Sequence, residues 1–517
     1  MIVGRDGRHT RAAAARASGF GRWGAMLRAI LVLLLMANAA RAKPNILLIV
    51  SEDNGPELGC YGDPFARTPH LDRLAAGGVR FERAFVPYSV CSPSRAAFLT
   101  GLYPHQNGQI GLATHKFALY DPDTPNAFTL LKAAGYRTGL IGKLHVNPES
   151  AFPVDFRRIP GANFHKRNVE EYASAAAEFF GASDRPFFLS INYPDAHLPF
   201  LRQQFGRPGE PLTGADVKPL PWVGIDSPRL REVTADYYNC LERLDQGIGL
   251  LLAELRKSGK ADDTLIVYIA DHGAQFPRGK VSVYEGGLRI PLILNWPGRV
   301  KPGTVRHELV STVDILPTFL KAAGAEIPAR LPGLPLQWLL DGEHAEWRRY
   351  VYGLATGSFP LAFQLRWSIR DERYKLIVNL VPGTENLGSR PYLDPDYPVT
   401  VVSGFTREEQ AAASPQVAAA LARFKTPPRC ELFDLEQDPH EWTNLADDPD
   451  HAAVRGRLER ALSEFRVETR DPFLDAQNVK AFQESQLAAR DLAYRKQSGF
   501  TWPYLESFRR WRKENRR

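Results

Sequence analysis

The sequence predicts an α/β protein with a large, mostly parallel sheet flanked by helices, plus a smaller antiparallel-sheet subdomain toward the C-terminus. From residue 44 to about residue 355, short apolar segments alternate with helical segments, as in parallel strands joined by crossover helices. Beyond that point the alternation stops, and β-rich segments suited to a hairpin take its place. The 517 residues are 44% apolar and 24% charged, an ordinary globular composition that is sufficient for a large core.

The strands of the main sheet are predicted from nearly continuous apolar runs, which are typical of parallel strands buried on both faces. The run NILLIV at residues 45–50 is the clearest of them, because only its first residue is polar. Similar runs predict three further strands, at residues 137–142, 186–193 and 264–270.

The helices between these strands are predicted from their boundary residues. Residues 68–78 begin with Thr68 as the N-cap and Pro69 in the first turn, and Gly77 and Gly78 stop the helix. Further helices are predicted at residues 91–100, 128–134, 232–257 and 311–324.

The C-terminal part has a different pattern. Residues 367–370 and 374–379 are predicted to form an antiparallel hairpin, and residues 431–449 a strand, a turn and a helix. Residues 381–428 are rich in proline, glycine and alanine, and they predict a loop insertion with one helix around residues 406–424. We expect a small antiparallel sheet with a packed helix here.

The first 42 residues are predicted to be a secretory signal peptide. Six arginines precede an apolar run at residues 29–36, and small residues follow up to Ala42, after which we expect cleavage. The apolar run is too short to span a bilayer, although an uncleaved membrane anchor is the alternative. We therefore expect an exported protein without a stable membrane anchor, in the periplasm, outside the cell or in a lysosome-like compartment.

The chain is thus divided into four predicted parts: the signal peptide at residues 1–42, a large α/β domain at 43–355, a C-terminal subdomain at 356–489 and a basic tail at 490–517. Loss of the seven arginines and one aspartate of the signal peptide would lower the formal net charge from +7 to +1. The tail has nine basic and three acidic residues, so it could contact a polyanionic glycan. A solvated terminal helix is the preferred interpretation, and nothing indicates a nucleic-acid partner.

Charged side chains follow four of the predicted strands at the point where each strand ends. In open α/β sheets, ligands bind at the carboxyl edge of the strands. The pattern therefore predicts a polar site at this edge of the sheet. Its members are Glu52 and Asp53 after the first strand, Lys143 and His145 after the second, Asp195 and His197 after the third, and Asp271 and His272 after the fourth.

The acidic members of this set predict a divalent metal site, formed by Glu52 and Asp53 with Asp271 and His272. Carboxylate oxygens suit Ca²⁺, the ion we expect, or Mg²⁺. A ring nitrogen of His272 would favour a borderline ion such as Mn²⁺. A helix cap or turn cap is the alternative role of the second pair.

Two segments of the chain carry recognisable motifs. CSPSRAAFLTG, from Cys91 to Gly101, fits the pattern Cys-x-Pro-Ser-Arg-x-x-x-Leu-Thr-Gly, and GYRTGLIGKLH runs from Gly135 to His145. Pro93 favours the first turn of a helix that begins at Cys91. The two segments lie about forty residues apart, and in this order they resemble the two signature segments of the type I sulfatase family.

The resemblance implies an alkaline-phosphatase-like sulfatase fold, in which residues 43–355 form the catalytic domain. It also implies that a formylglycine-generating enzyme oxidises Cys91 to formylglycine. One hydroxyl of the hydrated aldehyde, deprotonated with help from Asp271, would attack sulfur. The metal ligands would be Glu52, Asp53, Asp271, His272 and the modified residue 91. The family usually has aspartate in place of Glu52 and asparagine in place of His272, so the identity of the metal stays open.

The resemblance assigns roles to five further residues of the site. Arg95 would hold the nucleophile together with the metal, and Lys143 and Lys280 would neutralise the sulfuryl oxygens. His197 would protonate the departing oxygen or nitrogen. His145 would accept the proton whose removal regenerates the aldehyde.

Within the family, the chain is most similar to the N-sulfoglucosamine sulfohydrolases, or sulfamidases, through segments such as HQNGQIGL at residues 105–112 and ETRDPFLD at residues 468–475. VYEGGLRIP at residues 283–291 departs from that group and is closer to other sulfatases. The similarity would place three residues beside a sugar pocket, with packing of the loop as the alternative role. They are His105, Asn107 and His115.

The predicted function is the release of sulfate from a sulfated saccharide, with the N-sulfate of a non-reducing-end glucosamine of heparan or heparin type as the substrate. The alternatives are an O-sulfatase acting on another glycan or a small sulfate ester, a phosphonate or phosphate monoesterase of the same superfamily, and a non-catalytic binder of sulfated glycans. The oligomeric state is not predicted. With Cys91 consumed by oxidation, Cys60, Cys240 and Cys430 allow at most one disulfide.

Overall fold

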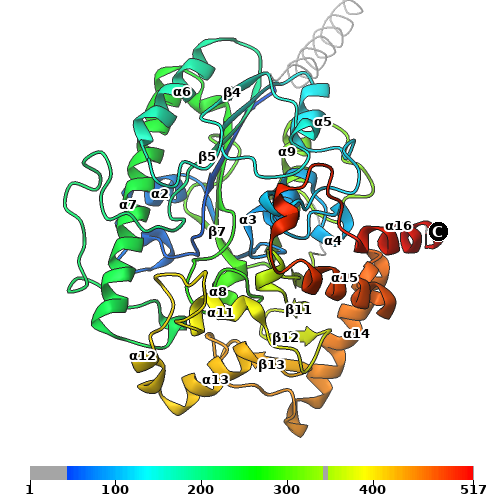
Figure 1. The fold of residues 1–517 in the computed structure, drawn as a ribbon. Coiled ribbons are helices and arrows are strands. Elements are labelled where there is room, and N and C mark those ends of the chain that lie inside the picture. The colour runs from blue at the N-terminus through cyan, green and yellow to red at the C-terminus, as the bar shows by residue number, and fades with distance from the viewer. Residues whose placement is uncertain (1–42, 342–346, 516–517) are drawn as a thin grey trace, which may run out of the picture. The chain divides into compact units, whose positions relative to one another are not determined.

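The computed structural model describes residues 43–341 and 347–515, and it confirms an α/β architecture with two sheets (Figure 1). The larger sheet has nine strands in the order β4-β3-β5-β1-β6-β7-β2-β8, with β9 paired to β2. Their bounds are β1 Asn45–Ser51, β2 Val79–Phe85, β3 Arg137–Gly142, β4 Phe156–Arg158, β5 Phe187–Asn192, β6 Thr264–Ala270, β7 Arg289–Asn295, β8 Thr304–Arg306 and β9 Val310–Ser311.

The larger sheet is mostly parallel, as predicted. β1 pairs in parallel with β5 and β6, and β3 pairs in parallel with β4 and β5. In the part of the chain that the structure describes, β7 is the one strand of this sheet that runs against its neighbours, β6 and β2. The strands β3, β5, β1 and β6 therefore lie side by side with their carboxyl ends along one edge.

Helices cover both faces of this sheet (Figure 1). Successive residues of β1 point to opposite faces: Leu48 and Val50 pack in one apolar cluster, and Leu47 and Ile49 in another. The first cluster includes side chains of α3, α5 and α9, and the second includes side chains of α2, α6 and α7. These helices are α2 Pro69–Ala76, α3 Cys91–Thr100, α5 Ala127–Ala133, α6 Val169–Gly181, α7 Pro228–Lys257 and α9 Ile315–Ala322.

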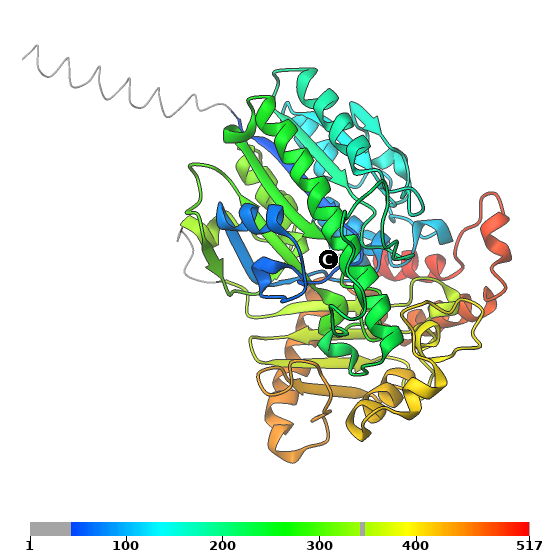
Figure 2. The ribbon, with the colours of Figure 1, turned by 90° about the vertical axis from the view of Figure 1, so that its left-hand side faces the viewer.

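The smaller sheet is antiparallel and has the strand order β10-β11-β12-β13 (Figure 2). Its strands are β10 Val351–Ala355, β11 Arg366–Arg370, β12 Tyr374–Asn379 and β13 Cys430–Asp434. The predicted hairpin corresponds to β11 and β12. The N–H of Leu354 in β10 donates to the carbonyl oxygen of Pro87, in the loop before α3, at 2.9 Å. This bond ties the smaller sheet to the loop that leads to the Cys91 helix.

The remaining helices are short or belong to the C-terminal part. They are α4 Pro104–Asn107, α8 Glu285–Leu288, α10 Gln337–Asp341, α11 Arg390–Leu393, α12 Arg407–Ala411, α13 Pro415–Lys425, α14 Ala452–Glu468, α15 Ala476–Ala488 and α16 Tyr504–Glu514. α14 packs against β11 and β12, which provides the helix expected beside the small sheet.

The C-terminal segment contains the predicted terminal helix, α16, and the basic side chains of this helix are exposed, but aromatic side chains also pack the segment against the rest of the protein. Tyr494 and Trp502 are buried, and so are Tyr504 and Phe508 of α16. Because aromatic side chains bury a large area, they hold this segment in place even though basic residues stand between them. In Figure 1, α16 lies beside α15 at the C-terminal end of the chain.

Two predicted helices differ in number or place in the structure, while others differ by a few residues at their ends, such as α7, which begins at Pro228 and not at residue 232. The helix expected around residues 406–424 is two helices, α12 and α13, because Ser414 caps a new helix by accepting the N–H of Val417. The helix expected within residues 431–449 begins later, at Ala452. The strand β2 was not predicted, since charged residues interrupt its sequence VRFERAF.

The predicted signal peptide, residues 1–42, lies outside the described residues. Among residues 43–341 and 347–515, no helix combines the length and the apolar character needed to cross a membrane. All four cysteines of the chain are free thiols, so the one disulfide that the sequence allowed is not formed.

Candidate active site

The charged groups that follow β1 and β6 come together at the carboxyl edge of the larger sheet. The backbone N–H of Asp53 donates to Asp271 Oδ1 at 3.1 Å, and the N–H of Asp271 donates to the carbonyl oxygen of Ser51 at 2.9 Å. Glu52, Asp53, Asp271 and His272 are all fully buried. Neighbouring parallel strands thus deliver these four residues to one point, as their positions in the sequence predicted.

Asp53 lies at the centre of the site. Its Oδ2 accepts a hydrogen bond from Lys280 Nζ at 2.6 Å, and its Oδ1 lies 3.2 Å from His272 Nε2. His197 Nε2 is 3.8 Å from the same carboxylate. Although burial opposes the shift, the basic groups of His197, Lys280 and His272 hold the pKa of Asp53 well below its ordinary value. This carboxylate is therefore ionised.

Glu52 forms a second acidic position of the site. Its Oε2 accepts a hydrogen bond from Lys143 Nζ at 2.6 Å, and Arg95 Nη2 lies 3.5 Å from Oε1. Oε1 is buried and has no hydrogen-bond partner among the described residues. Burial raises the pKa of Glu52 to about 8, although Lys143 and Arg95 oppose the shift. A positive charge placed beside this carboxylate would stabilise its ionised form.

Asp271 and His272 complete the acidic cluster. Asp271 Oδ2 accepts a hydrogen bond from Arg95 Nε at 3.1 Å, which fixes both side chains. Nδ1 of His272 lies 3.0 Å from the carbonyl oxygen of Gly273, so its Nε2 faces the site. Although burial opposes the shift, the carboxylates of Asp271 and Asp53 raise the pKa of His272 to about 9.

These residues fit a divalent cation. Ligand atoms of Asp53, Cys91, Asp271 and His272 all lie within 4.8 Å of one another, and so do those of Glu52, Asp53, Cys91 and His197. Oε1 of Glu52 has Arg95 Nη2 at 3.5 Å but accepts no hydrogen bond from a described residue, so this buried oxygen could bind a cation. The group of Asp53, Cys91, Asp271 and His272 supplies two carboxylates and one ring nitrogen, a donor set suited to a hard or borderline divalent ion, and Glu52 belongs to the neighbouring group.

Cys91 is the first residue of α3, as predicted, and its side chain faces this cluster. Its Sγ lies 3.4 Å from His272 Nε2 and 4.0 Å from Asp53 Oδ1. The helix ends at Gly101, whose φ of 67° is left-handed and suits glycine. Although burial opposes the shift, Lys143 and Lys280 lower the pKa of the Cys91 thiol.

Lys280 reaches the site from a strained loop. The next residue, Val281, has a φ of 71°, which is a genuine outlier for a β-branched residue. The N–H of Val281 donates to the carbonyl oxygen of Ser89 at 3.0 Å, and Gln364 Nε2 donates to the carbonyl oxygen of Val281. Both bonds hold the strained backbone that directs Lys280 toward Asp53.

His197 is held by contacts on three sides. Its ring stacks on Phe164 with centroids 3.8 Å apart, and its Nδ1 lies 2.6 Å from the carbonyl oxygen of Leu198. Arg167 Nη2 donates to the carbonyl oxygen of His197 at 2.5 Å. Burial is the main reason that the pKa of His197 lies well below its ordinary value. Nε2 is left facing Asp53 and the cavity.

His145 lies in the wall of the same cavity. Its φ of 59° is left-handed, which is uncommon for a residue other than glycine and is found often at functional sites. Neither ring nitrogen has a hydrogen-bond partner among the described residues. Burial, with Lys143 and Arg95 nearby, lowers the pKa of His145 well below its ordinary value. The ring is therefore a neutral acceptor.

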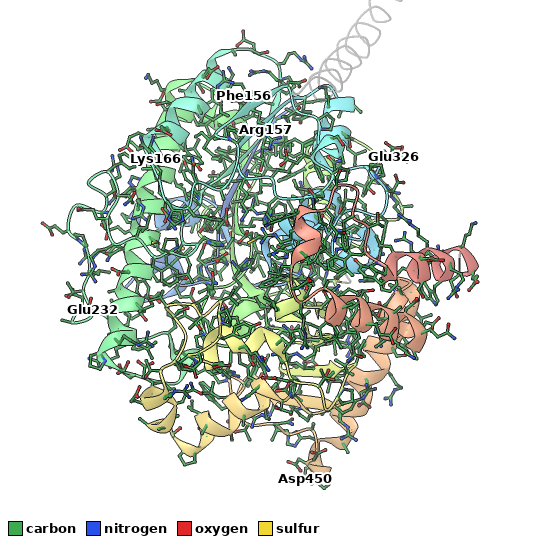
Figure 3. All side chains as sticks on the ribbon, viewed as in Figure 1. Phe156, Arg157, Lys166, Glu232, Glu326 and Asp450 are labelled. Atoms are coloured by element: carbon green, nitrogen blue, oxygen red, sulfur yellow. The ribbon has the colours of Figure 1, made fainter. Side chains whose placement is uncertain are left out.

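A cavity of about 470 Å³ opens above these residues. Cys91, Lys143, His145, His197 and Lys280 line its floor. Its outer part combines apolar and aromatic side chains with polar and charged ones. The outer lining includes Leu112, Thr114, Glu149, Arg157, Phe164, Gln275, Ser358, Phe359 and Tyr392. Arg157, which is labelled in Figure 3, belongs to β4. Its Nη2 lies 2.9 Å from Glu149 Oε2.

Several residues that shape the site were not predicted. Asn192, the last residue of β5, accepts a hydrogen bond from Arg95 at 2.8 Å, and Arg167 and Arg243 both bind Asp195. Asp195 was expected among the charged strand-end residues, but it points to these two arginines and does not line the cavity. A buried arginine has no local sequence signal, so only its tertiary partners reveal it.

The three residues expected to flank a sugar pocket do not line the cavity. His105 Nε2 lies 2.9 Å from Thr469 Oγ1, and Asn107 Nδ2 donates to the carbonyl oxygen of Leu102 at 3.2 Å. His115 Nδ1 lies 2.6 Å from Tyr494 Oη. All three are buried in loop packing, which was the alternative role.

The burial of His105 leads to an expected pH dependence of stability. Burial lowers its pKa from an ordinary value of 6.5 to about 3. Below pH 6.5 the unfolded chain therefore binds a proton that the folded protein excludes, and stability is lost progressively as the pH falls. We expect His105→Phe, which keeps an aromatic ring, to reduce the loss of unfolding free energy at pH 5 by on the order of 2 kcal/mol. Urea unfolding at pH 5 and pH 8 measures it.

The same change at the exposed His165 is the control, and we expect no comparable effect on the difference in unfolding free energy between pH 5 and pH 8. An equal pH dependence in the unaltered protein and in the His105→Phe variant would contradict the expectation.

The chain matches two family models. The first, described as Sulfatase, matches residues 44–325, more than half of the chain. The second, described as N-sulphoglucosamine sulphohydrolase, C-terminal, matches residues 276–384. The two matches overlap in the segment that carries Lys280.

Similar proteins span most of the chain. Human N-sulphoglucosamine sulphohydrolase is 33% identical over 481 residues, which are 86% of this chain and 94% of that protein. An ulvan-active sulfatase of Formosa agariphila is 30% identical over 439 residues, 82% of this chain and 80% of that protein.

A solved structure of BT4656 in complex with its substrate D-glucosamine-2-N,6-O-disulfate has a TM-score of 0.62 at 20% identity. It covers 83% of this chain and 98% of that one, and it supports the fold alone. The predicted alkaline-phosphatase-like sulfatase fold is thereby confirmed. From the family model and the human relative together, the chain belongs to the sulfatase family of hydrolases.

Proposed function

We propose that the protein removes the N-sulfate from a non-reducing-end glucosamine of a heparan-type or heparin-type saccharide. The observation that carries the sulfatase part is the place of Cys91, 3.4 Å from His272 at the floor of a cavity and beside two buried lysines. The preference for N-sulfate is supported by the second family model and by the name of the human relative.

Maturation of Cys91 is part of the proposal. A formylglycine-generating enzyme would oxidise it, and the hydrated aldehyde would supply the hydroxyl that attacks sulfur. The start of α3 suits this task because backbone N–H groups of the first turn lack intrahelical partners and favour negative charge. Arg95 is held by Asp271 and Asn192, so its guanidinium is fixed beside residue 91.

A divalent metal would be held by Glu52, Asp53, Asp271 and His272, with Ca²⁺ the proposed ion and Mg²⁺ or Mn²⁺ the alternatives. When bound, it would supply positive charge that lowers the pKa of an oxygen nucleophile and neutralises sulfuryl oxygens. It would also satisfy the buried Oε1 of Glu52, which has no hydrogen-bond partner in the described part of the protein.

The protein's own side chains would do the rest. Lys143 and Lys280 are buried and charged at the cavity floor, so they would bind sulfate oxygens in a setting that excludes water. Asp271, an ionised carboxylate, would draw the proton from the nucleophile. His145, whose ring nitrogens are free of hydrogen bonds among the described residues, would accept the later proton.

His197 would protonate the departing amine. Its pKa is low in the free site, but the entry of a sulfate anion favours the charged imidazolium and raises that pKa. The stacking on Phe164 and the bond to Leu198 leave Nε2 as the atom that faces the substrate.

This role leads to an expected dependence on the leaving group. His197→Ala should slow release of sulfate from N-sulfated glucosamine by roughly 10²-fold. Hydrolysis of 4-nitrophenyl sulfate should fall by less than about tenfold, because nitrophenolate leaves without a proton. The kcat values for both substrates measure the difference, with His307→Ala as the control. Equal losses on both substrates would rule out proton donation by His197.

The substrate itself is tested with protein produced together with a formylglycine-generating enzyme. Sulfate release is measured from N-sulfated glucosamine and, in parallel, from glucosamine 6-O-sulfate. Release from the first sugar alone is the expected result. Release from the second alone would keep the family and discard the proposed substrate.

An O-sulfatase acting on another glycan or a small ester is the second candidate. VYEGGLRIP at residues 283–291 favours it, because this segment departs from sulfamidases. A phosphonate or phosphate monoesterase is the third, favoured by the Asp-His pair at 271 and 272. Release of phosphate or phosphonate, with no release of sulfate, would establish it.

We also propose that residues 1–42 direct export.

A further inference from the structure

A second hollow adjoins the catalytic cavity. It has a volume of about 840 Å³ and is formed by the turn after α4 and the segment between α15 and α16. Thr114 lines both the hollow and the catalytic cavity, so the two spaces meet at this residue. The residues that line the hollow are Ala113, Thr114, Lys116, Asn147, Asp491, Leu492, Ala493, Arg495 and Lys496.

Three of these residues are exposed cations: Lys116, Arg495 and Lys496. Within residues 43–341 and 347–515, no carboxylate forms an ion pair with any of them, in contrast to arginines such as Arg158, Arg202 and Arg457. Asp491 is the one acid of the hollow, and its Oδ1 accepts the N–H of Ala493 at 3.1 Å, so it serves the local turn. The hollow therefore has a net positive charge.

Lys116 occupies a position that would suit glycine. It ends the short helix Ala113–His115 in a left-handed conformation, with a φ of 64°. A residue with a side chain is disfavoured there relative to its ordinary conformation. Its side chain makes no hydrogen bond or ion pair that would offset this cost within the described part of the chain. Strained backbone conformations that no local contact stabilises cluster at binding sites.

The walls of the hollow are fixed to those of the catalytic cavity. Tyr494 lies in the segment after α15 and directly precedes Arg495 and Lys496. Its hydroxyl lies 2.6 Å from His115 Nδ1. His115 also stacks on Phe359 with ring centroids 4.7 Å apart, and Phe359 lines the catalytic cavity. Tyr494 also packs on Trp502 at 4.9 Å. The cations are thus presented by an ordered segment at a fixed place beside the cavity.

We propose that Lys116, Arg495 and Lys496 form an anion-binding subsite that continues the active site and receives the acidic group of the next sugar along the substrate. This inference rests on the proposed function, since it supposes an anionic oligosaccharide with its terminal unit in the catalytic cavity. A sugar unit that leaves the cavity past Thr114 would enter the hollow, where a carboxylate or second sulfate would meet the three cations.

The test is a triple variant with Lys116→Gly, Arg495→Ala and Lys496→Ala. The glycine relieves the left-handed strain, so loss of folding should not obscure the result. We expect kcat/KM for an N-sulfated tetrasaccharide of glucosamine and uronic acid to fall roughly tenfold or more at low salt. For the N-sulfated monosaccharide, it should stay within about twofold. The difference should shrink near 1 M salt, where the screening length is about 3 Å.

A matched control variant replaces Arg256, Lys257 and Lys301 by alanine, three exposed cations away from the cavity. Equal losses on both saccharides in the subsite variant, or a loss in the control of the same size, would overturn the proposal. An unchanged kcat/KM for the tetrasaccharide would do the same.

Direct binding separates this proposal from the proposed function. Fluorescence anisotropy of a labelled heparin tetrasaccharide is measured on Cys91→Ala protein with and without the three subsite changes, so no turnover is needed. Weaker binding in the subsite variant supports the subsite even if the unaltered enzyme releases no sulfate from any saccharide. Equal binding of the tetrasaccharide by the two proteins overturns the proposal. Binding to phosphatidylserine vesicles is measured in parallel, and a loss confined to the vesicles would overturn the proposal as well.

Discussion

Replacing Cys91 by alanine should lower sulfate release by at least ~10⁴-fold, since removal of a covalent nucleophile leaves only binding and charge stabilisation. In the structure this thiol is the group at the cavity floor that faces Asp53 and His272 together. Alanine cannot be oxidised to an aldehyde, so the variant cannot mature. Sulfate release from N-sulfated glucosamine, measured as kcat, gives the loss.

The fold should survive this change, because the side chain loses only its sulfur at a position that faces a cavity. Thermal unfolding checks that. Cys430→Ala, in the smaller sheet, is the control for loss of a thiol, and we expect its activity to stay within about twofold of that of the unaltered protein. Mass spectrometry of the peptide that contains residue 91 completes the test. Full activity with an unmodified cysteine would end the formylglycine mechanism.

Asp53→Asn should release the metal and lower kcat/KM by roughly 10³-fold, since the site loses the ionised carboxylate at its centre. Asp53 accepts the hydrogen bond of Lys280 and faces His272 and Cys91. An amide has the same shape but no charge, so the repulsion between the lysine and a bound cation would no longer be offset. Metal content after dialysis, by elemental analysis, is the direct measurement.

The matched control is Asp314→Asn, a buried aspartate that pairs with Arg348 outside the cavity. It should be less stable than the unaltered protein yet keep its metal. If Asp53→Asn retained a full equivalent of metal while the activity fell, Asp53 would act on the substrate or on residue 91 instead. If both quantities stayed unchanged, the proposed ligand set would be wrong.

Part of the fold could be predicted because burial leaves a direct trace in sequence. β3 and β6 have the bounds predicted from their apolar runs, and β1 extends one residue further, since parallel strands must be apolar on both faces. β2 was missed for the opposite reason: its charged residues sit at partly exposed positions of a strand beside the reversed β7. The local sequence pattern of β2 does not reveal that this segment will pair with β7.

The C-terminal segment shows the same limit. Its basic residues predicted a solvated helix, but Trp502, just before that helix, is buried and stacks on Phe117, which is far away in the sequence. His105 was expected beside a sugar because of a similar segment in other proteins, but its partner is Thr469. Charge and local motif could not identify either contact.

The sequence by itself determined the chemistry of this site: a cysteine at a helix start, carboxylates and basic residues at four strand ends, and two motif segments in a set order. Only the tertiary structure decided that Asp195 supports His197 through Arg167 instead of lining the cavity, and that Phe164 orients the histidine ring. It also decided that the C-terminal segment borders the second hollow beside the cavity. The physical reason is that strand direction brings strand ends to one edge whatever the sequence between them. Buried ion pairs, ring stacking and loop packing depend instead on partners that the chain brings together only when it folds.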